Sequence, residues 1–345
     1  MYKGGPSRTG EADGIGPVAP AAIAWSVPSS GVIKSSPVVV AGVLSIVAGD
    51  GSVVALGSAD GAPRWTSAKK DYAGSPDIAG KRLFVIAGDS SIAALDLTDG
   101  HEIWRASGSF IGNASPLPLD DLVIVGGTTG GLVAFDAATG DVRWTYPTKG
   151  SIVHGASTAD DVVYVGSEDG ILHAVAASTG LAVWTLDAKS THFATTAVRD
   201  GVVYAMASTE SAASVLAVAA TTGKVIWTFE PPAGTKLRTP SVTKDAVYVS
   251  GIEGGLFVLN ATDGSRRWTF SGATVTEAAI GIAGHVVYAF TTDRKVNAFD
   301  PVTGEVQWSV PLKGVVDVGT TIASGMLFAG DSGGNIFAVG TTPSP

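Results

Sequence analysis

The sequence predicts an all-β protein, an eight-bladed β-propeller of four-stranded antiparallel blades whose ring is closed by the N-terminal strand. The first observation is a lattice of eight tryptophans, which follow one another at spacings of 40, 39, 40, 40, 43, 41 and 40 residues. The second is the unit between them, clearest at Asp161–Trp184. Two apolar segments joined by an acidic-glycine turn precede a Thr-Gly turn and a short segment that ends in tryptophan. A fixed period near 40 residues with several short strands is typical of propellers.

The two ends of the chain supply the third observation. Residues 1–21 form a lead-in rich in Gly, Pro and Ala, and residues 22–27 are expected to form a single strand that carries Trp25 without preceding hairpins. The far end has two apolar segments, 326–329 and 336–339, but no tryptophan strand after them. We therefore expect one propeller over residues 22–345, in which residues 22–27 complete the last blade and leave no unpaired sheet edge at the seam.

The hairpin strands of each repeat are apolar on both faces, as in Val162–Val165 and Val202–Ala205. A sheet with one solvated face would alternate apolar and polar residues, whereas a sheet packed between two neighbours buries both faces. The Asp-Gly and Thr-Gly pairs are expected to form the turns, because glycine adopts positive φ at low cost.

The recurring block is clearest at Ala134–Trp144, with the pattern Ala-x-Asp-x-x-Thr-Gly-x-x-x-Trp. A small alanine leaves room for a neighbouring indole, and the Asp and Thr side chains can hydrogen-bond the backbone of the turn. Each buried tryptophan removes on the order of 200 Å² from water. We interpret the tryptophans as structural contacts between blades rather than as ligand contacts: Trp25, Trp65, Trp104, Trp144, Trp184, Trp227, Trp268 and Trp308.

Composition argues against several classes of function. The net charge is -9 and no cluster of Lys and Arg stands out, which argues against nucleic acid and anionic membranes as partners. The chain has no cysteine, so a disulfide framework and a thiolate metal site are excluded. No apolar run approaches the roughly 18–20 residues of a membrane span, so we expect no direct membrane insertion. We expect a monomer in isolation.

The recurring block resembles the tryptophan-docking motif of the pyrroloquinoline quinone (PQQ) dehydrogenase propellers. The resemblance extends to the BamB-like and PQQ-like repeat superfamily and covers residues 22–340. Tyr2–Gly5 with Ser7–Gly10 also looks like the lead-in that often precedes such repeats in bacterial proteins. The Gly-His and Trp-Asp signatures of WD-repeat propellers are absent.

The resemblance implies a non-enzymatic protein-binding scaffold or sensor that presents loops on one ring face to a protein partner. One implied partner is an outer-membrane β-barrel assembly machine. Alternatively, the resemblance implies that the propeller is the sensor region of a bacterial receptor kinase. It also implies an extracytoplasmic setting, periplasmic or cell-surface, with a signal or anchor that is not present in this chain. The N-terminal residues lack the apolar segment of a signal peptide, so we expect either a cytoplasmic protein or a mature or excised region whose signal or anchor was removed.

Candidate binding residues come from aligning the eight predicted channel strands. In a repeat protein, functional residues usually occupy the positions at which the sequences of the repeats differ. Unique polar residues near the channel mouth are Lys34, Asn113, His154, Arg238, Glu277 and Asp317. Ring closure is expected to bring Glu277, Asp317 and Lys34 together. These residues either form solvated ion pairs along a wet channel or bind a ligand or peptide.

The alternative function is a quinone-dependent dehydrogenase or a small-molecule sensor that uses the channel. The resemblance to PQQ dehydrogenases implies a Glu, Asn and Asp set around calcium, a catalytic Asp and commonly an adjacent cysteine pair. Here cysteine is absent, and repeat spacings near 40 leave no long inserted loops. Asn113, Glu277 and Asp317 could imitate oxygen ligands of a hard cation, yet they come from separate repeats. The five histidines have no metal-ligand spacing, so we assign no catalytic residue, metal or cofactor.

Two further features bear on partner binding. Acidic residues occupy the turns between the second and third strands: Asp50, Asp89, Glu168, Asp169, Glu210, Glu253, Asp293 and Asp331. They are either ordinary hairpin residues or an acidic docking face for a basic partner. The turn Ser208–Ser214 is longer than its counterparts, and a loop that departs from a regular array is a candidate partner contact. The connection Glu230–Gly234 is expected at the same end of the ring.

Overall fold

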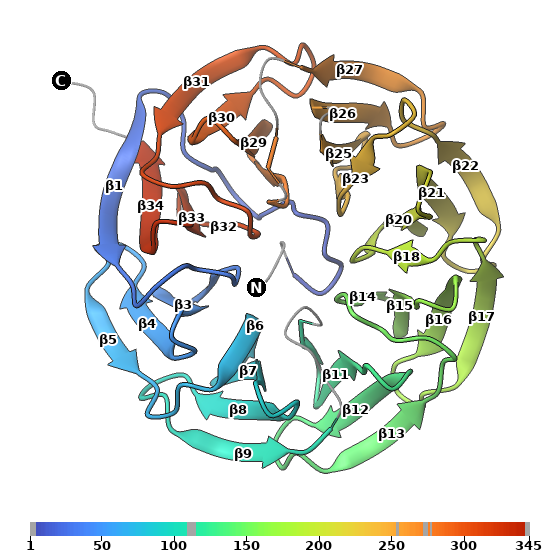
Figure 1. Ribbon diagram of the computed structural model, residues 1–345, viewed down its shortest axis with the longest axis horizontal. Helices are drawn as coiled ribbons and strands as arrows, with labels where there is room; N and C mark the ends of the chain where they lie inside the picture. Colours follow the sequence, from blue (N-terminus) through green and yellow to red (C-terminus); the bar gives the residue numbers. More distant parts are fainter. Residues whose placement is uncertain (1–4, 109–114, 253–254, 272–274, 277, 342–345) are drawn as a thin grey trace.

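The computed structural model describes residues 5–108, 115–252, 255–271, 275–276 and 278–341. Eight antiparallel sheets surround a central axis, and the chain visits them in order around the ring (Figure 1). The predicted eight-bladed propeller is confirmed. No helix in the described part of the chain is long and apolar enough to cross a membrane.

Each blade runs from an inner strand at the channel to an outer strand at the rim. Blades 1 to 4 comprise β2 (Val38–Val40), β3 (Val43–Val47), β4 (Val53–Gly57) and β5 (Pro63–Thr66); β6 (Tyr72–Ala79), β7 (Arg82–Ala87), β8 (Ile92–Asp96) and β9 (Glu102–Ala106); β10 (Leu117–Leu119), β11 (Leu122–Gly126), β12 (Leu132–Asp136) and β13 (Val142–Tyr146); β14 (Ser157–Ala159), β15 (Val162–Gly166), β16 (Ile171–Ala176) and β17 (Ala182–Asp187).

In blades 5 and 6 the inner strand is split into two short pieces that pair with the same neighbour. Blades 5 to 8 comprise β18 (His192–Phe193), β19 (Ala197–Arg199), β20 (Val202–Ser208), β21 (Ala213–Ala219) and β22 (Val225–Phe229); β23 (Lys236–Leu237), β24 (Ser241–Val242), β25 (Ala246–Ile252), β26 (Gly255–Asn260) and β27 (Arg266–Phe270); β28 (Gly281–Ala283), β29 (Val286–Thr291), β30 (Lys295–Phe299) and β31 (Val306–Pro311); β32 (Thr321–Ala323), β33 (Met326–Gly330), β34 (Asn335–Thr341) and β1 (Ala21–Pro28).

The ring is closed by the N-terminal strand, as predicted. β1 pairs antiparallel with β34, from Ala21 opposite Thr341 to Pro28 opposite Asn335. Figure 1 shows this as the dark blue strand beside the red one. The strand is one residue longer at each end than the 22–27 segment expected from the sequence. Because its outer strand comes from the other end of the chain, blade 8 has no turn between its third and fourth strands.

The core lies in layers between blades rather than in one central mass. Middle strands are buried on both faces, whereas outer strands such as β17 alternate between exposed and half-buried residues. The buried apolar side chains of the described residues form eight clusters, each shared by two neighbouring blades. One of them joins Leu44 and Ile46 of blade 1 to Phe328 of blade 8 across the seam. Each blade is therefore stabilised by its neighbours.

The tryptophans connect successive blades in a repeated geometry. The indole N–H of Trp144 donates to the carbonyl oxygen of Ala177 in the next blade (2.8 Å). Gly180 lies against the ring, and a Cβ there would be 2.7 Å from the indole carbons. The same bond to the next blade is made, at 2.7–3.1 Å, by the other tryptophans of blades 1 to 6 and by the one on β1: Trp25, Trp65, Trp104, Trp184, Trp227 and Trp268.

Trp308 differs because it faces blade 8, which lacks the docking turn. Its indole N–H is buried and has no hydrogen-bond partner among the described residues. Near this position the hydroxyl of Tyr288, whose ring lies 5.8 Å from the Trp308 ring, donates to the carbonyl oxygen of Pro17 (2.9 Å). The lead-in thus contributes to the one interface where the repeated contact is missing.

Candidate functional site

The ring has two chemically different faces. We call the face that carries the turns between second and third strands the B–C face, and the face that carries the turns between first and second strands the A–B face. Every connection between blades returns the chain to the B–C face. Lys34, His154 and Asp317 lie there, because they precede the inner strands of their blades, and Arg238 lies between the two pieces of the inner strand of blade 6.

The described mouth residues differ in exposure. Lys34 and Asp317 are exposed, and His154 and Arg238 are half-buried. Asn113 and Glu277 lie outside the described residues, so the expected grouping of Glu277 with Asp317 and Lys34 remains a prediction. The backbone N–H of Arg238 donates to the carbonyl oxygen of Ser250 (2.9 Å), which fixes this residue against the second strand of its blade.

His154 has a neighbour that its sequence position does not indicate. The ring of His192, from the next blade, lies edge-on to it with centroids 6.1 Å apart and an interplanar angle of 84°. The Nδ1 atom of His192 is in turn 3.7 Å from a carboxylate oxygen of Glu168. This trio places two imidazoles and a carboxylate at the mouth between blades 4 and 5, a suitable surface for polar or cationic groups of a partner.

Lys34 borders a cavity of about 290 Å³ between blades 1 and 2. Its walls include Ser35, Gly51, Tyr72 and Gly74. The cavity is small, and Lys34 is the charged residue on its rim, so it suits a short acidic group rather than a cofactor. Across the described ranges, no group of three His, Cys, Asp or Glu side chains is placed to hold a metal ion. Of the three residues that could imitate the oxygen ligands of a hard cation, only Asp317 lies within the described residues.

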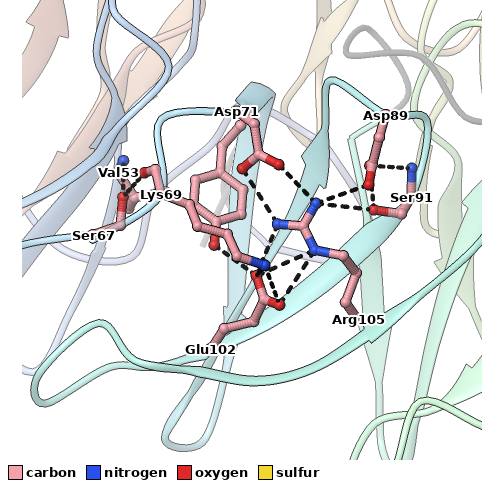
Figure 2. A network of polar contacts seen from close by, with 9 residues as sticks. Val53, Ser67, Lys69, Asp71, Asp89, Ser91, Glu102 and Arg105 are labelled. Carbon is pink, nitrogen blue, oxygen red and sulfur yellow. Dashed lines mark hydrogen bonds and ion pairs between the residues drawn. The ribbon is translucent and has the colours of Figure 1, made fainter.

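Between blades 1 and 2, the B–C face also carries an ion-pair network centred on Arg105 (Figure 2). Its guanidinium contacts Asp71 (2.9 Å), Asp89 (3.1 Å) and Glu102 (2.8 Å). Burial raises the pKa of the Glu102 carboxyl, but hydrogen bonds from Arg105, Lys69 and the Tyr72 hydroxyl outweigh it and hold that pKa at about 2. Burial and the Glu102 carboxylate together raise the pKa of Tyr72. The network joins the connection between the blades to β9, which is a structural role, and repeat alignment gave no sign of it.

The acidic turns mostly serve their own backbone. The carboxylate of Asp50 accepts from the Ser52 N–H (3.0 Å), that of Asp169 from the Ile171 N–H (3.1 Å) and that of Asp331 from the Asn335 N–H (2.8 Å). Asp331 is also buried. These contacts favour ordinary hairpin chemistry over an acidic docking face.

Three hollows on the B–C face surround the connection between blades 5 and 6. A cavity of about 620 Å³ lies between Pro232–Thr235 and the outer part of blade 6, at Phe257 and Arg266. Cavities of about 370 and 410 Å³ lie between the same connection and the long turn of blade 5, which includes Ser208–Ala213. The long turn 208–214 and the connection 230–235 thus form the walls of one hollowed region.

The opposite end of the channel is occupied by the lead-in, which repeat analysis left without a role. Residues 5–12 cross the A–B end of the channel (Figure 1). The carbonyl oxygens of Pro6 and Ser7 accept from the backbone N–H groups of Thr158 (3.0 Å) and Val198 (2.9 Å). Further along, Glu11 forms an ion pair with Arg199. An isolated arginine among Gly, Ser and Thr, at position 8, was the one signal in the sequence.

Comparisons with known proteins extend the resemblance. The family model described as outer membrane protein assembly factor BamB matches residues 17–151, 147–230 and 211–342. The crystal structure of BamB from Moraxella catarrhalis is 22% identical, with a TM-score of 0.77 over 95% of this chain and 99% of that one. Quinohemoprotein alcohol dehydrogenase from Comamonas testosteroni is 15% identical, with a TM-score of 0.76 over 99% of this chain and 80% of that one.

The computationally designed Ika8 protein is also similar, at 14% identity with a TM-score of 0.78, over 92% of this chain and 98% of that one. At these identities the structural likeness shows the fold alone. A search of curated proteins finds no match.

Proposed function

This chain belongs to the family of the outer membrane protein assembly factor BamB, and from that premise we propose that it is a non-enzymatic binding propeller. Its B–C face presents the long turn 208–214 and the connection 230–235 to a protein partner. In keeping with the family's description, the proposed setting is extracytoplasmic and the proposed partner is a component of outer membrane protein assembly. The sensor region of a receptor kinase would use the same face in the same way.

The observation that supports this proposal is the grouping of three hollows around the long turn 208–214 and the connection 230–235. The hollows of about 370 to 620 Å³ around the two irregular segments all lie on the B–C face of blades 5 and 6. Rigid strands hold these loops, and a loop placed by a rigid scaffold is where binding is usually found. The A–B end of the channel is crossed by residues 5–12, which line a cavity of about 970 Å³ together with A–B turn residues such as Asp160 and Asp245.

The test uses paired substitutions on the two faces of one blade. Glu210→Arg combined with Ala212→Arg adds bulk and positive charge at exposed positions of the long B–C turn. Thr221→Arg adds the same group at an exposed position at the other end of blade 5. Affinity purification from a periplasmic extract should recover the partner with the wild type and with Thr221→Arg, but not with the double variant. Equal recovery by all three chains would contradict the proposed face.

The second candidate, a quinone-dependent dehydrogenase or small-molecule sensor, is favoured only by the shared fold with quinohemoprotein alcohol dehydrogenase. Thermal unfolding separates the two candidates. A ligand that binds the folded state raises the melting temperature. A binding propeller should melt at the same temperature with and without PQQ and calcium, whereas a rise of several degrees would favour the second candidate.

A further inference from the structure

The lead-in is bound in the channel by a regular series of backbone contacts. Carbonyl oxygens at positions 6, 7, 9 and 10 accept from the N–H of the residue at the same register position of the inner strand in four successive blades, at 2.6–3.0 Å. In order these donors are Thr158, Val198, Val242 and Ile282. Inner strands are the channel-side edges of their sheets, so these N–H groups would otherwise lack a protein partner. The lead-in therefore accepts one such backbone hydrogen bond from each of blades 4 to 7.

The series covers blades 4 to 7, and blades 2 and 3 show why it does not continue. The equivalent residue in blade 3 is Pro118, which has no N–H. The equivalent N–H in blade 2, at Ile78, is already bonded to the side chain of Asp77 (2.9 Å). Together with blade 4, these two blades offer a side-chain pocket instead.

That pocket holds Arg8, whose side chain is 0% exposed. Its guanidinium is 3.2 Å from the carboxylate of Asp77, which is itself buried. It also donates to the carbonyl oxygens of Pro116 (2.7 Å) and Ala156 (3.3 Å). A buried guanidinium is tolerated only where a carboxylate and acceptors are in place. Blades 2, 3 and 4 each supply one of these groups, so the pocket is specific for arginine.

A second position also restricts the sequence that fits. Gly10 has φ +74°, and a Cβ there would lie 2.4 Å from the hydroxyl of Ser241 and 2.8 Å from the carbonyl oxygen of Ile280. The backbone cannot move away, because the Gly10 carbonyl is bonded to Ile282. A side chain at this position is excluded.

The segment after this series contributes little to the contact. Asp13, Gly14 and Ile15 are exposed, and a Cβ on Gly14 would meet nothing within 4 Å. Residues 5–12 therefore bind the ring through contacts of their own, and the exposed residues 13–15 link them to the rest of the chain. Recognition by backbone pairing at strand edges with pockets for selected side chains is how sheets bind extended peptides.

We propose that the A–B end of the ring is a binding site for an extended peptide with the pattern Arg-x-Gly, and that residues 5–12 are its ligand in cis. A ligand tethered by a short flexible linker has an effective concentration in the millimolar range. The site therefore stays filled by residues 5–12 in the intact chain. This inference does not depend on the proposed protein-binding function.

The test starts from the complete chain with a protease site inserted after Gly14. The protein is folded, cut and then titrated with a fluorescent peptide of residues 5–14, with binding followed by anisotropy. The peptide should exchange into the cut ring and should bind the uncut ring at least 100-fold more weakly, because the tethered copy competes.

Peptide variants test the recognition without altering the ring. The Arg8→Ala peptide should bind at least 100-fold more weakly, since it removes the cation that contacts the buried Asp77 carboxylate. The Gly10→Ala peptide should also lose binding, whereas Asp13→Asn, at an exposed position, should bind like the parent. Three results would each overturn the proposal: unfolding of the ring on cutting, equal binding to cut and uncut rings, or equal binding of the Arg8→Ala peptide.

Discussion

Replacing a docking tryptophan by phenylalanine should have opposite consequences at Trp144 and Trp308. Both indoles are half-buried, and both lose a similar apolar area, worth about 1 kcal/mol at 25 cal/mol per Å². Trp144→Phe also removes the bond to the Ala177 carbonyl, which adds about 1 kcal/mol. Trp308→Phe instead removes a buried N–H without a partner among the described residues, a group whose desolvation costs about 1–3 kcal/mol. The Trp144 variant should therefore be less stable by about 2 kcal/mol, and the Trp308 variant should be as stable as the wild type or more so.

The assay is urea unfolding followed by far-ultraviolet circular dichroism, which does not depend on the number of tryptophans. The free energy of unfolding is compared only where the m-value is unchanged, because a changed slope would signal a different unfolding reaction. An equal loss of stability at the two positions would refute the reasoning. It would mean that the indole hydrogen bonds between blades add nothing beyond buried area.

Two other predictions concern a docking glycine and the ion-pair network. Gly140→Ala places a Cβ 2.7 Å from the Trp104 ring, whereas Gly42→Ala, at nearly the same φ (+80° and +78°), meets nothing within 4 Å. Urea unfolding should show Gly140→Ala to be less stable than Gly42→Ala by about 2 kcal/mol, and equal values would exclude the packing explanation. Because the pKa of Glu102 is about 2 in the folded state, below its ordinary value, its carboxylate stabilises the protein above pH about 4.5, and this contribution is lost as the pH falls toward 2. Between pH 6 and pH 3 the wild type should lose about 2 kcal/mol more stability than Glu102→Gln, and parallel losses would show that Arg105 does not stabilise this carboxylate.

The architecture was predictable because each blade contributes one tryptophan at a nearly constant spacing in the sequence. Blade number followed from the spacing, and closure followed from a tryptophan strand at one end that is missing at the other. The second role of glycines such as Gly180 was not predictable. One repeat shows that its turn needs positive φ, but not that the indole of the preceding blade packs against it.

The contacts that individual residues make were harder to predict from the sequence. His154 was singled out, yet its neighbour His192 occupies a different position in its own repeat, so alignment does not pair them. Arg8 and Asp77 are far apart in the chain, and neither belongs to a repeated pattern. Repetition predicts what the blades share, whereas a contact between a segment outside the repeats and one particular blade depends on the completed ring.

The pairing of β1 with β34 also sets the order in which the protein can be made. A ribosome delivers β1 before β34, so the eighth sheet cannot assemble until β34 has been synthesised. Until then seven blades can stack only as an open arc, with β1 unpaired and one face of blade 1 uncovered. Pairings between such distant segments form slowly and leave strand edges open to association during the delay. The growing chain is therefore most exposed to misassembly just before β34 arrives.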